Sequence, residues 1–128
     1  MNVQRIKRGC LAALLPALLV GGFFVTACFR DDRLDHRPPS GQGSIIVDNR
    51  TSREINVFID GDEQSRVRAR RWRAYDVDPG VYRMVLDERN GERNYRDDVD
   101  VLERRLTILD VTADPDRFDR FSVFVYFD

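Results

Sequence analysis

The chain has 128 residues, 34% of them charged, and a formal net charge of −1. One domain with appendages fits this length, and a second hydrophobic core is excluded, because a domain usually takes roughly 100 to 150 residues. The charge is uneven, since three basic residues and no acid precede Cys28, whereas 18 basic and 22 acidic side chains follow it. This mildly acidic remainder argues against nucleic acid as a partner.

The N-terminus has the order of a secretory signal. A short basic stretch, MNVQRIKRG, precedes the uncharged apolar run CLAALLPALLVGGFFVTA, which ends in small residues. The closing residues VTAC resemble the lipobox of bacterial lipoproteins, whose pattern is an aliphatic residue, a small residue, Gly or Ala, and cysteine. The resemblance implies a signal peptide at residues 1–27, recognition of Val25, Thr26 and Ala27, and lipidation of Cys28 with acyl chains such as palmitate.

An uncleaved transmembrane helix is the alternative. The 21 residues from Gly9 to Phe29 carry no charge, which at about 1.5 Å per residue suffices to cross a hydrocarbon core of roughly 30 Å. Pro16 and the pair Gly21 and Gly22 weaken such a helix, so a lipoprotein is favoured over a single-pass signal-anchor protein. In both cases the basic end stays inside and the remainder is exported.

The residue after Cys28 bears on the destination. In enterobacterial lipoproteins an Asp at this position favours retention in the inner membrane, whereas this chain has Phe29. The resemblance therefore implies a lipid-anchored protein of the cell envelope, in the outer membrane and facing the periplasm. Two or more acyl signals make such an anchor stable, because each buried methylene contributes about 0.8 kcal/mol.

A flexible tether is expected over residues 28–43, beginning with the lipidated cysteine. The stretch FRDDRLDHRPPSGQG has no hydrophobic period and contains two prolines and two glycines, which is typical of a linker. Fully extended, residues 29–43 reach about 50 Å, so the folded part is expected to stand away from the bilayer. His36, the only histidine, is expected to be a solvated linker side chain.

From Ser44 onward the hydrophobic period is two, which indicates half-buried strands. Turn signals separate them, namely Asp60-Gly61, Asp78-Pro79-Gly80 and Asn90-Gly91, of which the last is the pair best suited to a two-residue hairpin. The expected strands, some with their turn residues, are SIIVDN, REINVFIDG, RVRAR, WRAYDVDPG, VYRMVLDE, YRDDVDVLE, RLTILDVTA and RFSVFVYFD.

This pattern predicts an all-β domain at residues 44–128, an antiparallel β-sandwich of immunoglobulin-like or transthyretin-like kind with about seven strands, preceded by a signal-peptide helix and a flexible linker. Residues 54–87 also resemble the small sandwich modules called PEGA domains and the DUF4397 repeats, through the DG turn and the motif PG-x-Y. That resemblance implies the same sandwich fold.

One expected strand is rich in arginine. In RVRARRWR, the side chains of Arg66, Arg68, Arg70 and Trp72 combine cations with an aromatic ring, which suits an anionic envelope glycan or lipopolysaccharide. The alternative is a solvated edge strand whose positive charge prevents pairing between sheets.

The last expected strand carries no charge from Phe121 to Phe127. Phe124 and Tyr126 fall on the face opposite to its other apolar residues. One interpretation is an apolar partner patch formed by Phe58, Phe124 and Tyr126. The other is burial of both faces of the strand, for example beneath a loop.

Catalytic groups are scarce after the signal. This part has no lysine, no histidine outside the tether and no thiol once Cys28 is lipidated, so the chain is expected not to be an enzyme and to need no cofactor. A pair of acids that cleaves a glycoside is the weaker alternative. The clusters DGDE, DDVD and DPDRFD are interpreted as turns and solvated strand faces rather than as a metal site, although two such loops could supply the oxygens that calcium requires.

The sequence thus predicts a membrane-anchored lipoprotein of the cell envelope with a non-enzymatic binding or assembly module. Its expected partners are the membrane, through the lipid, and an envelope protein or glycan.

Overall fold

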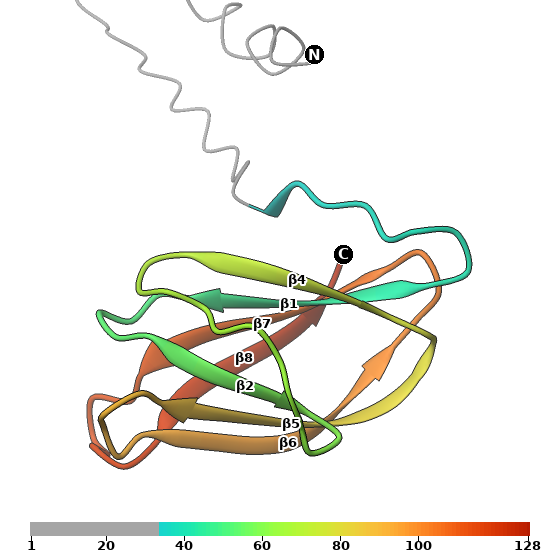
Figure 1. Ribbon diagram of the computed structural model, residues 1–128. Helices are drawn as coiled ribbons and strands as arrows, with labels where there is room; N and C mark the ends of the chain where they lie inside the picture. The colour runs from blue at the N-terminus through green and yellow to red at the C-terminus, as the bar shows by residue number, and fades with distance from the viewer. Residues whose placement is uncertain (1–33) are drawn as a thin grey trace, which may run out of the picture. The chain divides into compact units, whose positions relative to one another are not determined.

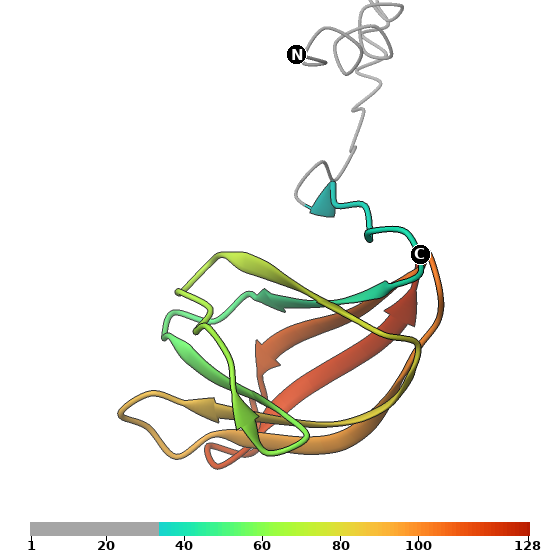
Figure 2. The same ribbon diagram turned by 45° about the vertical axis from the view of Figure 1, so that its right-hand side comes forward.

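The computed structural model describes residues 34–128, which belong to one compact unit. Eight strands form two four-stranded sheets, and residues 34–128 contain no α-helix. Figures 1 and 2 show the two sheets facing each other around a common interior. The predicted all-β sandwich is confirmed, whereas the predicted signal helix lies outside the described residues.

The first sheet has the order β4-β1-β7-β8. Its strands are β1 (Gly43–Asn49), β4 (Trp72–Val77), β7 (Leu106–Ala113) and β8 (Phe121–Phe127). β1 pairs antiparallel with β4 but parallel with β7, and β7 pairs antiparallel with β8. The prediction of a purely antiparallel sandwich is therefore wrong at one pair. Parallel neighbours need a long connection, and here the chain between β1 and β7 passes through the other sheet.

The second sheet has the order β3-β2-β5-β6 and is antiparallel throughout. Its strands are β2 (Ile55–Ile59), β3 (Asp62–Glu63), β5 (Gly80–Glu88) and β6 (Asn94–Val101). Residues on β2, β5 and β6 alternate between a buried inner face and a more exposed outer face. This alternation is the period of two that the sequence shows.

Two turns explain the hairpins of the second sheet. Asp60 and Gly61 have φ of 50° and 84° between β2 and β3, as a two-residue hairpin loop of this hand requires. The predicted two-residue turn at Asn90 and Gly91 is wrong, because the Glu88 amide donates to the Arg93 carbonyl at 2.8 Å and leaves a four-residue loop. Asn90 still adopts the left-handed conformation, with φ of 58°.

The interior between the sheets is apolar and draws on both of them. Alternate apolar residues of β2, β5 and β6 are buried there, together with residues of β1, β7 and β8. The principal members are Ile45, Val47, Ile55, Val57, Met84, Leu86, Val99, Val101, Leu109, Val111 and Phe121. No helix within residues 34–128 is long and apolar enough to cross a membrane.

Candidate functional site

The outer face of the sheet β4-β1-β7-β8 carries a second apolar cluster. Ile46, Leu106 and Ile108 are buried in it, and partly buried side chains pack around them, namely Leu34, Trp72, Ala74 and Tyr126. The register explains the cluster, since Ala74, Ile46, Ile108 and Tyr126 lie in one row across the four strands. Every residue of β1 is consequently buried, as expected for a strand that is covered on both faces.

Residues 34–42 cover this outer face, and Figure 1 shows them running along the outer side of β1 and β4. His36 Nε2 lies 2.7 Å from Asp76 Oδ1, and the Ser44 hydroxyl donates to the same oxygen at 2.5 Å. Burial raises the pKa of Asp76, but the hydrogen bonds from Ser44 and His36 outweigh it and hold this pKa below 3.8. Residues 34–42 are therefore not the free tether that was predicted up to Gly43. His36 lies against Asp76 and is not the solvated linker side chain that was expected.

Two carboxylates lie side by side on the same outer face. Asp48 of β1 is directly opposite Asp110 of β7 in the parallel pair. Arg50 Nε lies 3.2 Å from Asp48 Oδ2 and 2.8 Å from Asp110 Oδ1. One guanidinium thus bridges two acids and offsets the burial of the Asp48 carboxylate, whose side chain is only 5% exposed.

A cleft of ≈ 290 Å³ opens beside this pair and is lined by Asp48, Asn49, Arg50, Arg70 and Trp72. The side chain of Arg70 makes no ion pair within the described part of the chain, so its guanidinium is available to a ligand. The ring of Trp72 is half-buried. The cleft therefore offers a cation and an aromatic surface, a combination that suits an anionic group.

Asn49 shapes the wall of the cleft. It is fully buried, and its Nδ2 donates to the carbonyls of Arg53 at 2.7 Å, Val67 at 3.2 Å and Arg68 at 3.1 Å. Its Oδ1 accepts hydrogen bonds from the amide and the hydroxyl of Thr51 at 2.9 Å and 2.7 Å. One amide side chain therefore binds the end of β1 to the segment that carries Arg70.

The predicted arginine-rich strand at residues 66–70 is not a strand, and this prediction is wrong. The segment connects β3 to β4 across the side of the sandwich, and only Val67 forms a bridge, with Ile55 of β2. The Tyr75 hydroxyl fixes the segment by donating to the Ser65 carbonyl at 2.5 Å, and burial raises the pKa of this hydroxyl. Crossing between sheets prevents the segment from running alongside a neighbour long enough to form a ladder.

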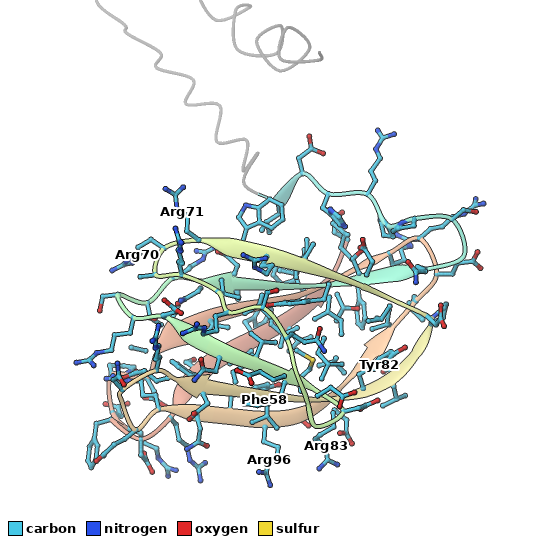
Figure 3. The ribbon with its side chains drawn as sticks, in the orientation of Figure 1. Phe58, Arg70, Arg71, Tyr82, Arg83 and Arg96 are labelled. Atoms are coloured by element: carbon cyan, nitrogen blue, oxygen red, sulfur yellow. The ribbon has the colours of Figure 1, made fainter. Side chains whose placement is uncertain are left out.

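The predicted arginine patch is divided as a result. Arg66 Nη1 lies 3.2 Å from Glu54 Oε1, so this cation is already paired. Arg68 and Arg70 are exposed and make no ion pair among residues 34–128, and Arg70 together with Trp72 lines the cleft. Arg71, which follows the turn, projects away from the molecule beside Arg70 in Figure 3.

The predicted patch of Phe58, Phe124 and Tyr126 does not exist as one surface. Phe124 and Tyr126 lie on β8 with their ring centroids 5.8 Å apart. Phe58 lies on the outer face of the other sheet, opposite Val85 of β5, and projects from the far side of the molecule from Arg71 in Figure 3. The prediction is wrong because alternation within a strand does not reveal which sheet the strand joins.

Two further points concern the lipidation motif and the acidic clusters. Val25, Thr26, Ala27 and Cys28 lie outside the described residues. Within residues 34–128, no three His, Cys, Asp or Glu side chains are grouped so that they could hold a metal ion.

Several residues of the site were missed by the sequence reasoning. Asp48, Arg50 and Asp110 meet only through the parallel register of β1 and β7, which no local pattern reveals. The unbroken apolar run before Asp48 is the one signal that pointed to burial on both faces. No family model matches the chain, and no curated protein is similar to it.

Proposed function

We propose that this chain is a membrane-anchored lipoprotein of the cell envelope whose β-sandwich is a non-enzymatic binding or assembly module. The observation that carries the proposal is the VTAC motif, which ends the only long apolar run of the sequence shortly before a folded all-β unit. The module faces the periplasm from the outer membrane.

The spacing between anchor and fold supports a role at the membrane surface. Leu34 already packs on the sandwich, so only residues 29–33 separate Cys28 from the folded part. Six residue steps span at most about 20 Å. A lipid on Cys28 would keep the sandwich within that distance of the bilayer, much closer than a free tether up to Gly43 allows.

Labelling of cells with radioactive palmitate tests the anchor. The unsubstituted chain and Cys10→Ser are expected to incorporate label, since Cys10 lies in the part that is removed. Cys28→Ser is expected to lose it. Equal labelling of Cys28→Ser and the unsubstituted chain would reject the lipoprotein. An unsubstituted chain that stays in the membrane at its full length and without label would favour the single-pass signal anchor.

A second candidate function is binding of an anionic envelope glycan or lipopolysaccharide. The arginines at the turn before β4 favour it, because Arg68, Arg70 and Arg71 make no ion pair within the described residues, and Arg70 lines the cleft with Trp72. This surface would hold phosphate or carboxylate groups through charge-assisted hydrogen bonds. The rest of the domain carries more acidic than basic residues, which favours this end for an anion.

Co-sedimentation of the full chain with lipopolysaccharide tests this candidate. Arg70→Ser combined with Arg71→Ser should weaken binding and reduce its dependence on salt concentration. The matched control is Arg104→Ser with Arg105→Ser, because both pairs are exposed and their first residues share a φ of 60°. Equal losses in the two double variants would reject a specific site.

A further inference from the structure

The outer face of the sheet β4-β1-β7-β8 carries aromatic side chains beside the part that residues 34–42 cover. Phe124 of β8 is 69% exposed, and its ring packs on Tyr126 with the centroids 5.8 Å apart. Trp72 lies on β4, at the other edge of the sheet, and strand pairing places it in the same row as Phe124. Aromatic rings therefore stand at both edges of this face.

The carboxylates of the same face are already held by partners in the protein. Asp48 and Asp110 share the guanidinium of Arg50. Asp76 lies against His36, with 2.7 Å between Oδ1 and Nε2. An approaching surface would therefore meet aromatic rings and paired acids.

The outer face of the other sheet, β3-β2-β5-β6, is charged along two strands. The outward residues of β5 and β6 include Arg83, Asp87, Arg96, Asp98 and Asp100. In Figure 3, Arg83 and Arg96 project from the side of the molecule opposite Arg71. Contact with an apolar surface would remove water from these charged groups, which is costly. The two outer faces therefore differ in what they can touch.

The connection to Cys28 starts from the aromatic face. Leu34 packs on the outer apolar cluster, as Trp72 and Tyr126 do, and only residues 29–33 lie between Leu34 and Cys28. Six residue steps reach at most about 20 Å. A membrane-bound Cys28 therefore holds this face close to the bilayer, and so short a connection raises the effective concentration at which weak contacts form.

We propose that this outer face rests on the bilayer that holds the anchor, with Trp72, Phe124 and Tyr126 at the level of the lipid headgroups. Trp and Tyr gather at that level in membrane proteins, because their rings are apolar while their N–H and O–H groups stay in contact with water. The inference rests on the membrane attachment of the proposed function, and it adds which side of the sandwich meets the lipid.

Arginines at one end of the face suit the lipid phosphates. Arg70 and Arg71 directly precede Trp72, are exposed, and make no ion pair within the described residues. A guanidinium binds phosphate oxygens through paired hydrogen bonds. Basic residues next to an anionic lipid surface are also attracted to it. The cations and the rings can therefore contact the headgroup region together.

The fluorescence of Trp72, the only tryptophan of the chain, tests the proposal in the full chain. The chain is reconstituted in vesicles of phosphatidylethanolamine and phosphatidylglycerol, with or without phospholipids brominated close to the headgroup. These vesicles contain no lipopolysaccharide, so quenching by bromine reports contact with the bilayer itself. Trp72 is expected to lose much of its fluorescence in the brominated vesicles.

A matched control moves the tryptophan to the other outer face. Trp72→Phe combined with Phe58→Trp leaves a single tryptophan on β2, where Phe58 projects from the side opposite Arg71 in Figure 3. This chain should keep its fluorescence, so that the loss for Trp72 is several-fold larger. Trp72→Phe with Phe124→Trp should be quenched as strongly as the unsubstituted chain.

Flotation of the vesicles separates a failure of the docking from a failure of the anchor. A chain that floats with the vesicles but keeps its Trp72 fluorescence would overturn the docking and leave the anchor standing. That result is expected if a second copy or a glycan covers the face. Equal quenching at positions 72 and 58 would also overturn it. A chain that does not float would reject the anchor and the docking together.

A second pair of variants tests the contact without moving the tryptophan. Phe124→Glu brings a carboxylate to the proposed contact and is expected to restore most of the Trp72 fluorescence in brominated vesicles. Val81→Glu is the control, because Val81 is 64% exposed and lies on the outer side of β5, opposite Asp100. It should leave the quenching unchanged. Equal quenching of Trp72 in the two variants would overturn the proposal.

Discussion

The two sheets differ in what covers their outer faces. On the sheet β4-β1-β7-β8, residues 34–42 and an apolar cluster bury the outer side of β1 and β7. On the sheet β3-β2-β5-β6, the outer side is partly exposed and carries charged pairs such as Arg83 with Asp98. In β1 and β7 a continuous apolar run therefore marks a strand covered on both faces, whereas β8 is uncharged and leaves Phe124 69% exposed. Alternating runs mark strands with one wet face.

The largest effect is expected from truncation in the outer apolar cluster. Ile108→Ala should lower the free energy of unfolding by about 3 kcal/mol, because Ile108 is 1% exposed and its removal leaves a cavity. Val85→Ala, at the outer face of the other sheet, should cost less than about 1 kcal/mol. Urea unfolding followed by fluorescence of Trp72, the only tryptophan, measures both. Equal losses would contradict the difference between the two faces.

Loss of the buried amide at the end of β1 is expected to have the next largest effect. Asn49→Ala leaves the buried Thr51 amide without its acceptor, which should cost about 2 kcal/mol. The control is Asn56→Ala on the half-buried outer face of β2, expected to change stability by less than about 0.5 kcal/mol. The same urea experiment compares them, and an Asn49→Ala chain as stable as Asn56→Ala would argue against the hydrogen-bonded hub.

The smallest effect concerns the attachment of residues 34–42 and depends on pH. The folded-state pKa of Asp76 is lowered below 3.8, so its carboxylate stabilises the fold above that value. The contribution disappears as the pH falls through the lowered pKa. Asp76→Asn should therefore be less stable than the unsubstituted chain at neutral pH, and the difference should vanish in strong acid.

Asp78→Asn is the control for this pH dependence, because the Asp78 carboxylate makes no hydrogen bond or ion pair within residues 34–128. Its stability should follow that of the unsubstituted chain at every pH. Hydrogen exchange of the Gly43 and Ser44 amides can locate the change at this attachment. A stability difference for Asp76→Asn that persists unchanged in acid would contradict the role of its carboxylate.

Most strands could be predicted because burial of one face imposes a period of two on the residues themselves. Ile55 and Val57, and likewise Met84 and Leu86, alternate with more exposed residues in the sequence, and all four are buried. The same rule failed at residues 66–70, where alternating arginines occur in a connection between sheets. Alternation there reflects a single buried contact, Val67 against Ile55, and not a ladder.

The candidate site could be predicted only in part. Arg70 and Trp72 are close in sequence, so a local pattern found them together. Asp48 and Asp110 are far apart in sequence and meet through the parallel pairing of β1 with β7. A lone Asp at the end of an apolar strand gives no sign of such a partner.

The sequence by itself determined where most of the strands run, which of their faces is apolar, and the lipobox-like motif before the folded unit, because each of these depends on neighbouring residues. Only the tertiary structure decided which strands are neighbours. It placed Phe58 on one sheet and Phe124 on the other, joined β1 to β7 in parallel, and laid Leu34 over the first sheet. Strand order depends on how distant segments share one core, and that choice leaves no mark on a single strand.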